Sequence, residues 1–127
     1  MNLIIIQQMT IQETSESKEP YILPDAITLK VHEVMDENVD KLVSLFKVLS
    51  DPVRIRILKA LQVSDLCVCV LVEITDYKHS ALSYHLKLLK DAELVDSRRD
   101  KNFQTYFLTE PGEKMLRTIE SSFKNGM

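Results

Sequence analysis

The sequence predicts a mainly α-helical fold with a single β-hairpin, and the spacing of its apolar residues is the basis of that prediction. From residue 25 to residue 92, apolar side chains recur at intervals of three and four, the period of helices with one buried face. Between residues 94 and 108 the pattern changes to alternation, which is typical of strands. A polar turn at residues 99–102 divides that stretch, so two strands and a hairpin are expected.

The order of the helices follows from their stop and start signals. Helices are expected at residues 25–49, 52–61, 66–74, 79–92 and from about residue 109 onward. The first region is either one long helix or two short ones with a break near residues 36–38. Asp51 can cap the second helix, and Pro52 loses no hydrogen bond at its first position. Asp76 is a candidate cap for the fourth helix.

Length and composition indicate one soluble, cytoplasmic domain. The chain has 127 residues, of which 45% are hydrophobic and 28% charged, which suits a globular core. Residues 1–24 show no sustained period and are expected to form a flexible arm, with the domain at residues 25–127. No apolar run is long enough for a membrane span or a signal peptide. Two cysteines are too few for a disulfide framework, so reduced thiols are expected.

Charge is unevenly distributed along the chain. The net charge is −3, but residues 1–45 hold three basic and eight acidic residues, and residues 46–127 hold thirteen basic and eleven acidic ones. The acidic excess therefore lies in the first third of the chain. The excess of two positive charges in the remainder is small, so charge alone is weak support for a nucleic-acid partner.

The fourth helix has two chemically different faces. Leu82, Leu86 and Leu89 form one apolar stripe. Polar side chains at the other side and at the amino end are Ser80, Ser83, Tyr84, Lys87 and His79. Three helices followed by a hairpin match a winged helix-turn-helix, in which such a helix enters the DNA major groove. His79, Ser80, Ser83 and Tyr84 are then candidates for base contacts and Lys87 for a phosphate contact, although an exposed helix face can also be merely solvated.

Two further groups of residues qualify as functional. Arg98, Arg99 and Lys101 lie at the hairpin, where they could neutralise DNA phosphates or simply confer solubility. Cys67 and Cys69 are two residues apart, and on a regular helix their side chains would point about 200° from each other. Both can meet one ion only where the start of the helix is unwound. A helix amino terminus also favours the thiolate, although two small core residues are the alternative.

Three stretches of the chain resemble the ArsR/SmtB family of metal- and metalloid-responsive repressors. They are Leu49 to Leu58, Asp65 to Cys69, and Ser83 to Val95 with the hairpin that follows. The resemblance implies binding to double-stranded operator DNA, and the amphipathic first and last helices suggest a homodimer paired through them. It also implies that Cys67 and Cys69 bind As(III), Sb(III), Cd, Pb or Zn as an inducer that releases the DNA, with no metal required for folding. His85, near the leucine side, is expected to be partly buried and hydrogen-bonded rather than a ligand.

The chain also departs from the family pattern. A trigonal arsenite site needs three thiolates, and the position one turn after the pair is Val72. A third ligand could come from His32, Asp65, a small thiol or the other subunit, with His32 more simply a surface residue. The last helix has no histidine for a zinc site, and Lys78 replaces the usual Ser at the start of the fourth helix.

Three hypotheses follow for the function. In the first, a DNA-binding repressor leaves its operator when the cysteines bind a thiophilic metal or metalloid. In the second, the same DNA-binding module uses the thiols as a redox switch or not at all. The third, a thiol enzyme or metal buffer without a nucleic-acid partner, is disfavoured because the cysteines are spaced by one residue, no strand is expected before them and no catalytic cluster is visible.

Overall fold

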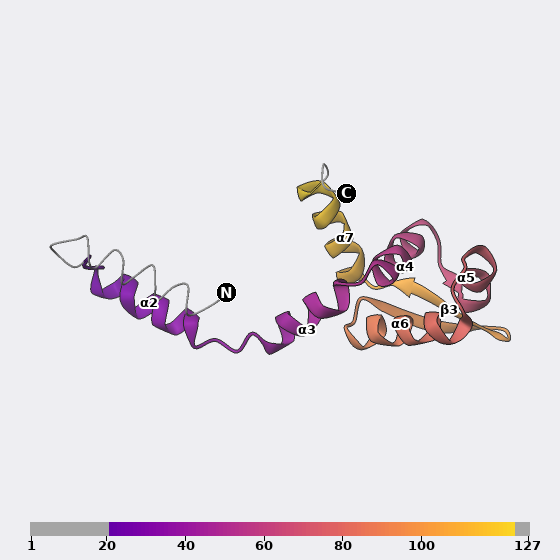
Figure 1. The fold of residues 1–127 in the computed structure, drawn as a ribbon, viewed down its shortest axis with the longest axis horizontal. Coiled ribbons are helices and arrows are strands. Elements are labelled where there is room, and N and C mark those ends of the chain that lie inside the picture. The colour runs from indigo at the N-terminus through magenta and orange to yellow at the C-terminus, as the bar shows by residue number, and fades with distance from the viewer. Residues whose placement is uncertain (1–20, 124–127) are drawn as a thin grey trace. The chain divides into compact units, whose positions relative to one another are not determined.

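The computed structural model describes residues 21–123 (Figure 1), and these belong to two compact units, with the described parts 21–38 and 39–123. Most of the predicted arm, residues 1–24, lies outside the described residues. The first unit contains helix α2 (Asp25–Met35), which has no buried residue. The predicted break near residues 36–38 is confirmed, because the next helix begins at Asp40. No helix within residues 21–123 is long and apolar enough to cross a membrane.

The second unit contains five helices and three strands among its described residues, and it confirms the predicted order of helices and hairpin. They are α3 (Asp40–Leu49), α4 (Pro52–Val63), β1 (Leu66–Cys67), α5 (Val68–Ile74), α6 (His79–Asp91), β2 (Val95–Asp100), β3 (Phe103–Leu108) and α7 (Glu110–Ser122). Strand β1 was not expected. Its two residues had been assigned to the start of the third helix, so the prediction that no strand precedes the cysteines is wrong.

The two predicted helix caps have different outcomes. The Asp51 carboxylate accepts hydrogen bonds from the backbone amides of Val53, at 2.8 Å, and Arg54, at 3.1 Å, and thereby caps α4. The cap predicted at Asp76 is wrong. Helix α6 begins after Lys78, whose side chain makes no capping bond. The first turn of α6 thus has no side-chain cap, and its backbone amides are not satisfied in the way those of α4 are.

The three strands form one antiparallel sheet in the order β1-β3-β2. The turn of the hairpin is only Lys101–Asn102, because the strands extend through Arg99 and Asp100, two residues that the sequence had placed in the turn. Lys101 has a φ of 58°, which is uncommon for a residue with a side chain. Because side chains alternate along a strand, Arg98 and Arg99 project from opposite faces of the hairpin.

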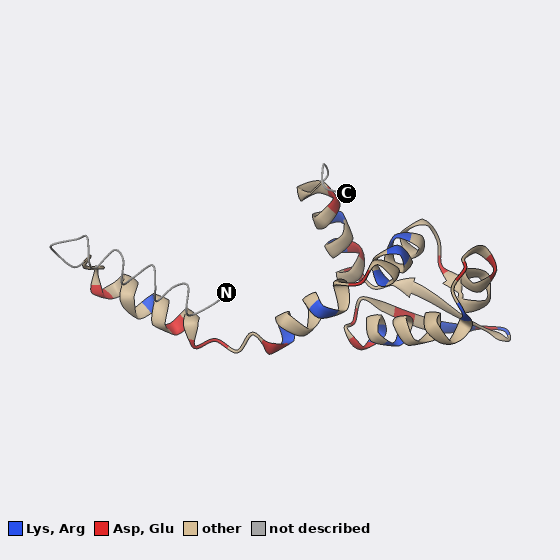
Figure 2. Cartoon of the chain, in the orientation of Figure 1, with Lys and Arg blue, Asp and Glu red and all other residues tan. Residues whose placement is uncertain are grey.

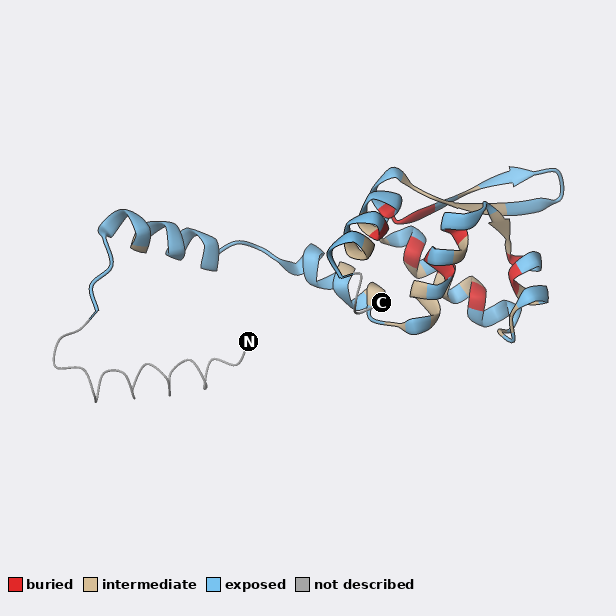
Figure 3. Cartoon of the chain, turned by 90° about the horizontal axis from the view of Figure 1, so that it is seen from above, coloured by how far each residue is buried: buried red, intermediate tan, exposed pale blue. Residues whose placement is uncertain are grey.

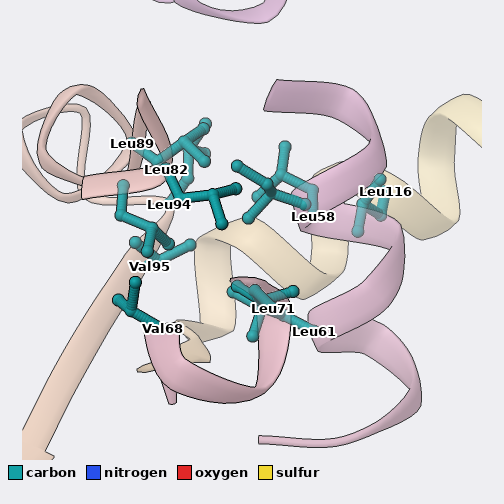
Figure 4. Packing of buried hydrophobic residues seen from close by; sticks show 11 residues of the cluster. Leu58, Leu61, Val68, Leu71, Leu82, Leu89, Leu94, Val95 and Leu116 are labelled. Atoms are coloured by element: carbon teal, nitrogen blue, oxygen red, sulfur yellow. The ribbon is translucent and has the colours of Figure 1, made fainter. Parts of the chain in front are cut away.

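The core of the second unit lies between helices α4, α5 and α6 and the base of the hairpin. Leu82, Leu86 and Leu89 of α6 are fully buried, as predicted from their spacing. They pack in one cluster with residues from the neighbouring elements (Figure 4), namely Ile57, Leu58, Leu61, Val68, Leu71, Leu94, Val95 and Leu116. Helix α6 is therefore anchored on one side by leucines from its middle and end.

The junction between α6 and β2 is held from two sides. Helix α6 ends with Glu93 at φ 63°, with the amide of Leu94 bonded to the carbonyl of Leu89 and that of Glu93 to the carbonyl of Lys90. This is the pattern of a Schellman motif. At the start of α7, the Thr109 amide donates to the Leu94 carbonyl and its hydroxyl to the Glu93 carbonyl. Gly112 is buried against Leu94, and a Cβ there would overlap the Leu94 carbonyl oxygen.

Candidate nucleic-acid interface

Helix α6 presents a polar face away from the core. His79, Ser80, Tyr84 and Lys87 are exposed and Ser83 is half-buried, while Leu82, Leu86 and Leu89 of the same helix are inaccessible to solvent. Figure 3 shows that buried and exposed positions lie on different sides of the helices of this unit. Tyr84 is 59% exposed. The Nδ1 atom of His79 lies 3.3 Å from the Ser83 hydroxyl, so two of these side chains interact with each other. The structure thus brings the five residues together on one accessible helix surface.

His85 lies on the same helix and contacts Arg54 of α4. Its Nδ1 atom is 3.2 Å from Nη1 of Arg54, and the residue is half-buried, as predicted. The Arg54 side chain is only 12% exposed, and its Nε donates to the Val48 carbonyl at 2.6 Å. Arg54 on α4 therefore joins the end of α3 to the middle of α6. Arg54 was not among the residues predicted from the sequence, although it lies inside one of the stretches that carry the family resemblance.

The three basic residues of the hairpin do not form a single cluster. Arg98 is bound by two carboxylates: its Nη1 donates to Asp65 at 2.8 Å and its Nε to Asp100 at 3.1 Å. The hydrogen bond to Asp65 is the main reason why the pKa of Arg98 is raised above its ordinary value. Within residues 21–123, neither Arg99 nor Lys101 has an ion-pair partner. Acidic and basic residues are interspersed along the hairpin (Figure 2).

The base of the hairpin is connected to the end of α6 by polar contacts. The Ser97 hydroxyl accepts hydrogen bonds from Nζ of Lys90, at 3.0 Å, and Nε2 of Gln104, at 2.9 Å. The same Lys90 ammonium lies 3.7 Å from Asp96. The hairpin and the helix are therefore held together at one end. The exposed face of α6 and the face of the hairpin that carries Arg99 are thus connected through the contacts of Lys90 with Ser97 and Asp96.

Cys67 and Cys69 lie at the junction of β1 and α5. Cys67 is extended, with φ −86° and ψ 160°, and Cys69 is the second residue of the helix. The pair therefore lies at the start of a helix, as predicted, with Cys67 outside the helical conformation. The expectation of reduced thiols is not met, because the two sulfurs form a disulfide. Their Cα atoms are 5.3 Å apart, a separation that suits such a bond. Cys67 is half-buried and Cys69 is exposed.

No third metal ligand accompanies the cysteine pair in the described part of the chain. Within residues 21–123, no three His, Cys, Asp or Glu side chains are grouped so that they could hold a metal ion. The Asp65 carboxylate is bonded to Arg98. His32, the other candidate, lies on α2 in the first unit, with its side chain exposed.

Comparison with known proteins places this arrangement in a family. Residues 51–97 match the model of the bacterial regulatory proteins of the arsR family. The arsenical resistance operon repressor of Staphylococcus xylosus is 43% identical over 68 residues, 54% of this chain. The chain spans 65% of that repressor's length. The arsenical resistance operon repressor of Bacillus subtilis is 38% identical over 79 residues, which are 61% of this chain and 75% of the repressor.

A solved structure supports the fold. The winged helix-turn-helix DNA-binding domain of Mb0332 from Mycobacterium bovis, described as homodimeric, superposes with a TM-score of 0.64. The superposition covers 69% of this chain and 82% of that domain, and at 22% identity the likeness concerns the fold alone. The helices, the hairpin and the sequence matches together show that this chain is a winged helix-turn-helix protein and belongs to the ArsR family of bacterial regulatory proteins.

Proposed function

We propose that the protein is a homodimeric repressor that binds operator DNA through α6 and the hairpin, and that Cys67 and Cys69 control this binding. The exposed polar face of α6 is the observation on which the proposal depends. Short polar side chains at the amino-terminal half of a helix can reach base edges in the major groove, provided that the helix is anchored from behind. The buried leucines provide that anchor.

The roles of the individual residues follow from their positions. His79, Ser80, Ser83 and Tyr84 contact bases, since they lie on the first two turns of α6. The basic side chains neutralise DNA phosphates, and the residues proposed for this role are Lys87, Arg98, Arg99 and Lys101. Alanine at Arg99 should weaken binding to all sequences and lower the salt slope by about one. Alanine at Ser83 should instead change which sequence is preferred, so a uniform loss would contradict the base-reading role of this residue.

The dimer is proposed to form through α3 and α7. Leu42, Val43 and Phe46 are large apolar residues left exposed on α3, and Phe123 is exposed at the end of α7. Large apolar residues gathered on one exposed helix, as on α3, are typical of an interaction site. A second copy of the chain is the occupant that a two-fold operator would require, because each half-site needs its own α6.

For the inducer, we propose a thiophilic metal or metalloid ion, of the class to which As(III), Sb(III), Cd, Pb and Zn belong. The similarity to arsenical resistance repressors supports this class, and thiolates are the ligands that soft metal ions prefer. Two cysteines at a strand–helix junction can approach one ion after reduction of the disulfide. A third ligand would then come from a small thiol or from another part of the dimer.

The disulfide favours a second candidate, a redox-controlled regulator of the same fold. Two thiols would lose two electrons and two protons to a peroxide, which would leave as water, and the Sγ–Sγ bond would form. The adjacent position of the sulfurs makes this reaction possible without movement of distant segments. In this case metals would have no effect on the DNA complex of the reduced protein, and peroxide or diamide would release it.

One titration tests both candidates. The reduced protein is bound to a fluorescent duplex taken from the DNA upstream of its own coding sequence, and arsenite, cadmium, zinc and diamide are added separately. Release by arsenite or cadmium supports the metal-responsive repressor, and release by diamide alone supports the redox candidate. Cys67→Ser should keep the DNA affinity and abolish the response. If the protein binds the duplex at low salt in neither the reduced nor the oxidised state, the proposed DNA-binding function is contradicted.

A further inference from the structure

The cysteine-bearing strand and the basic hairpin meet in one row of the sheet. Cys67 of β1 pairs with Thr105 of β3, and Thr105 pairs with Arg98 of β2. Residues opposite each other in antiparallel strands project from the same face, so Cys67 and Arg98 flank Thr105 on one side of the sheet. The core-facing side carries the next row, which includes Leu66 and Tyr106.

Asp65 reinforces this row from outside the strand. Its carboxylate accepts a hydrogen bond from Nη1 of Arg98 at 2.8 Å, over 33 residues of sequence. The Arg98 guanidinium lies 5.5 Å from the centroid of the Phe107 ring, and therefore crosses β3 to reach Asp65. Asp65 directly precedes β1 and is two residues from Cys67. The ion pair thus connects the segment that holds the cysteine pair to the outer strand of the hairpin.

We infer that the Asp65–Arg98 ion pair transmits the state of the cysteine pair to the hairpin, with Asp65 as a positioning residue. This inference rests on the proposed function. Arg98 is one of the hairpin cations, and Asp65 competes with a DNA phosphate for its guanidinium. Any change at Cys67 that displaces Asp65 alters where Arg98 and its strand lie. The hairpin is then the part of the DNA-binding surface that responds to the thiols.

The Asp65–Arg98 ion pair is too exposed to contribute much to the free energy of folding, so it can be removed without unfolding the protein. The side chains of Arg98 and Asp65 are 48% and 47% exposed, and ion pairs this exposed contribute little to folding. Replacement of Asp65 should therefore leave the protein folded. A matched control exists on the same arginine, since Asp100 also binds Arg98, at 3.1 Å, but lies within the hairpin itself. Asp65→Asn and Asp100→Asn remove the same charge from the same partner, and only the first disconnects the cysteine-bearing segment.

The test compares the two redox states of the full-length protein. Dithiothreitol breaks the Sγ–Sγ bond by passing two electrons and two protons to Cys67 and Cys69, and itself becomes a cyclic disulfide. The dissociation constant for the upstream duplex is measured before and after reduction. In the wild type and in Asp100→Asn the two constants should differ by a coupling factor on the order of 5- to 150-fold. In Asp65→Asn the factor should fall to within about twofold of unity. A wild-type factor of one, or an unchanged factor in Asp65→Asn, overturns the inference.

A second readout does not depend on DNA. In ¹H–¹⁵N spectra of the free protein, reduction should shift the Nε signal of Arg98 and the amides of Lys101 and Asn102 in the wild type and in Asp100→Asn. These shifts should be lost in Asp65→Asn, and their persistence there would overturn the inference. If the wild type binds no DNA but shows the shifts, the proposed function fails while the link stands. If it binds DNA and Asp65→Asn retains the coupling, the link fails alone.

Discussion

Helices α6 and α3 each carry a stripe of apolar residues at helical spacing, but only the stripe of α6 is buried by other parts of the chain. Leu82, Leu86 and Leu89 of α6 are 0% exposed. On α3, Leu42 is 52% and Phe46 is 61% exposed, and only residues near the end of the helix pack against the core. The difference shows that a helical pattern alone does not identify the partner of an apolar face. One stripe orients a polar surface toward DNA in our proposal, and the other is available to a second subunit.

The largest effect is expected where the covered stripe is broken. Leu86→Ala removes a fully buried side chain from α6, and such truncations cost about 2–5 kcal/mol of the free energy of unfolding. Urea unfolding followed by circular dichroism measures this loss. Lys87→Ala, at the next and exposed position, should stay within about 0.5 kcal/mol of the wild type. Equal losses in both variants would show that α6 is not anchored by its leucines.

Substitutions in the exposed stripe of α3 should change the self-association constant rather than the packing of the core. Burial of a Phe side chain contributes about 1.5–3 kcal/mol, so Phe46→Ala should weaken self-association by about ten- to a hundredfold for each side chain covered. Sedimentation equilibrium measures this constant. Lys47→Ala, the neighbouring exposed position on α3, is the control and should have little effect. An unchanged constant in Phe46→Ala would remove α3 from the proposed dimer contact.

A smaller effect is expected at the end of α6, where the backbone is left-handed at Glu93. Glycine adopts this conformation without the steric penalty of a side chain. Glu93→Gly should therefore raise the free energy of unfolding by about 0.5–1 kcal/mol, after allowance for the greater freedom of the unfolded chain. Thermal unfolding provides the measurement. Ala92→Gly, one residue earlier at φ −82°, should lower stability instead, and a gain there would contradict the explanation.

The mildest effect should appear at acidic pH, at the cap between α3 and α4. The hydrogen bond from the Arg54 amide is the main cause of the lowered pKa of Asp51. The pKa of Asp51 is lower in the folded state than its ordinary value of 3.8. The ionised carboxylate therefore stabilises the folded protein at pH values above 3.8, and this stabilisation is lost as the pH falls through the pKa of the folded state. Between about pH 6 and pH 3, wild-type stability should fall more steeply than that of Asp51→Asn. Parallel profiles would contradict the cap as the cause.

The sequence predicted the fold well because its elements are long and periodic. The leucines of α6 and the Asp51 cap each depend on neighbours within four residues, and both were predicted correctly. Strand β1 was missed because two residues are too short to show a period. The Asp65–Arg98 contact joins residues 33 positions apart, so no local pattern could reveal it. Strand alternation could have separated Arg98 from Arg99, but the expected turn was two residues too wide.

The disulfide was missed for a different reason. Two cysteines were too few for a disulfide framework, and the bond between them indeed links no distant segments. A bond between near neighbours depends instead on the change from strand to helix between Cys67 and Cys69. An unwound helix start was predicted here, but as a place where two reduced thiols would meet an ion, and the extended conformation of β1 was not predicted.

Gly112 allows the backbone of α7 to pack directly against the backbone at Leu94. Main chain rests directly on main chain where α7 meets the α6–β2 connection, with the Leu94 carbonyl occupying the volume that any other residue would need for its Cβ. Rotamer changes cannot adjust such a contact, since no side chain intervenes. A displacement of α7 would therefore move the α6–β2 connection with it. In the proposed dimer, the separation of the two α6 helices would then depend on how the two α7 helices are held.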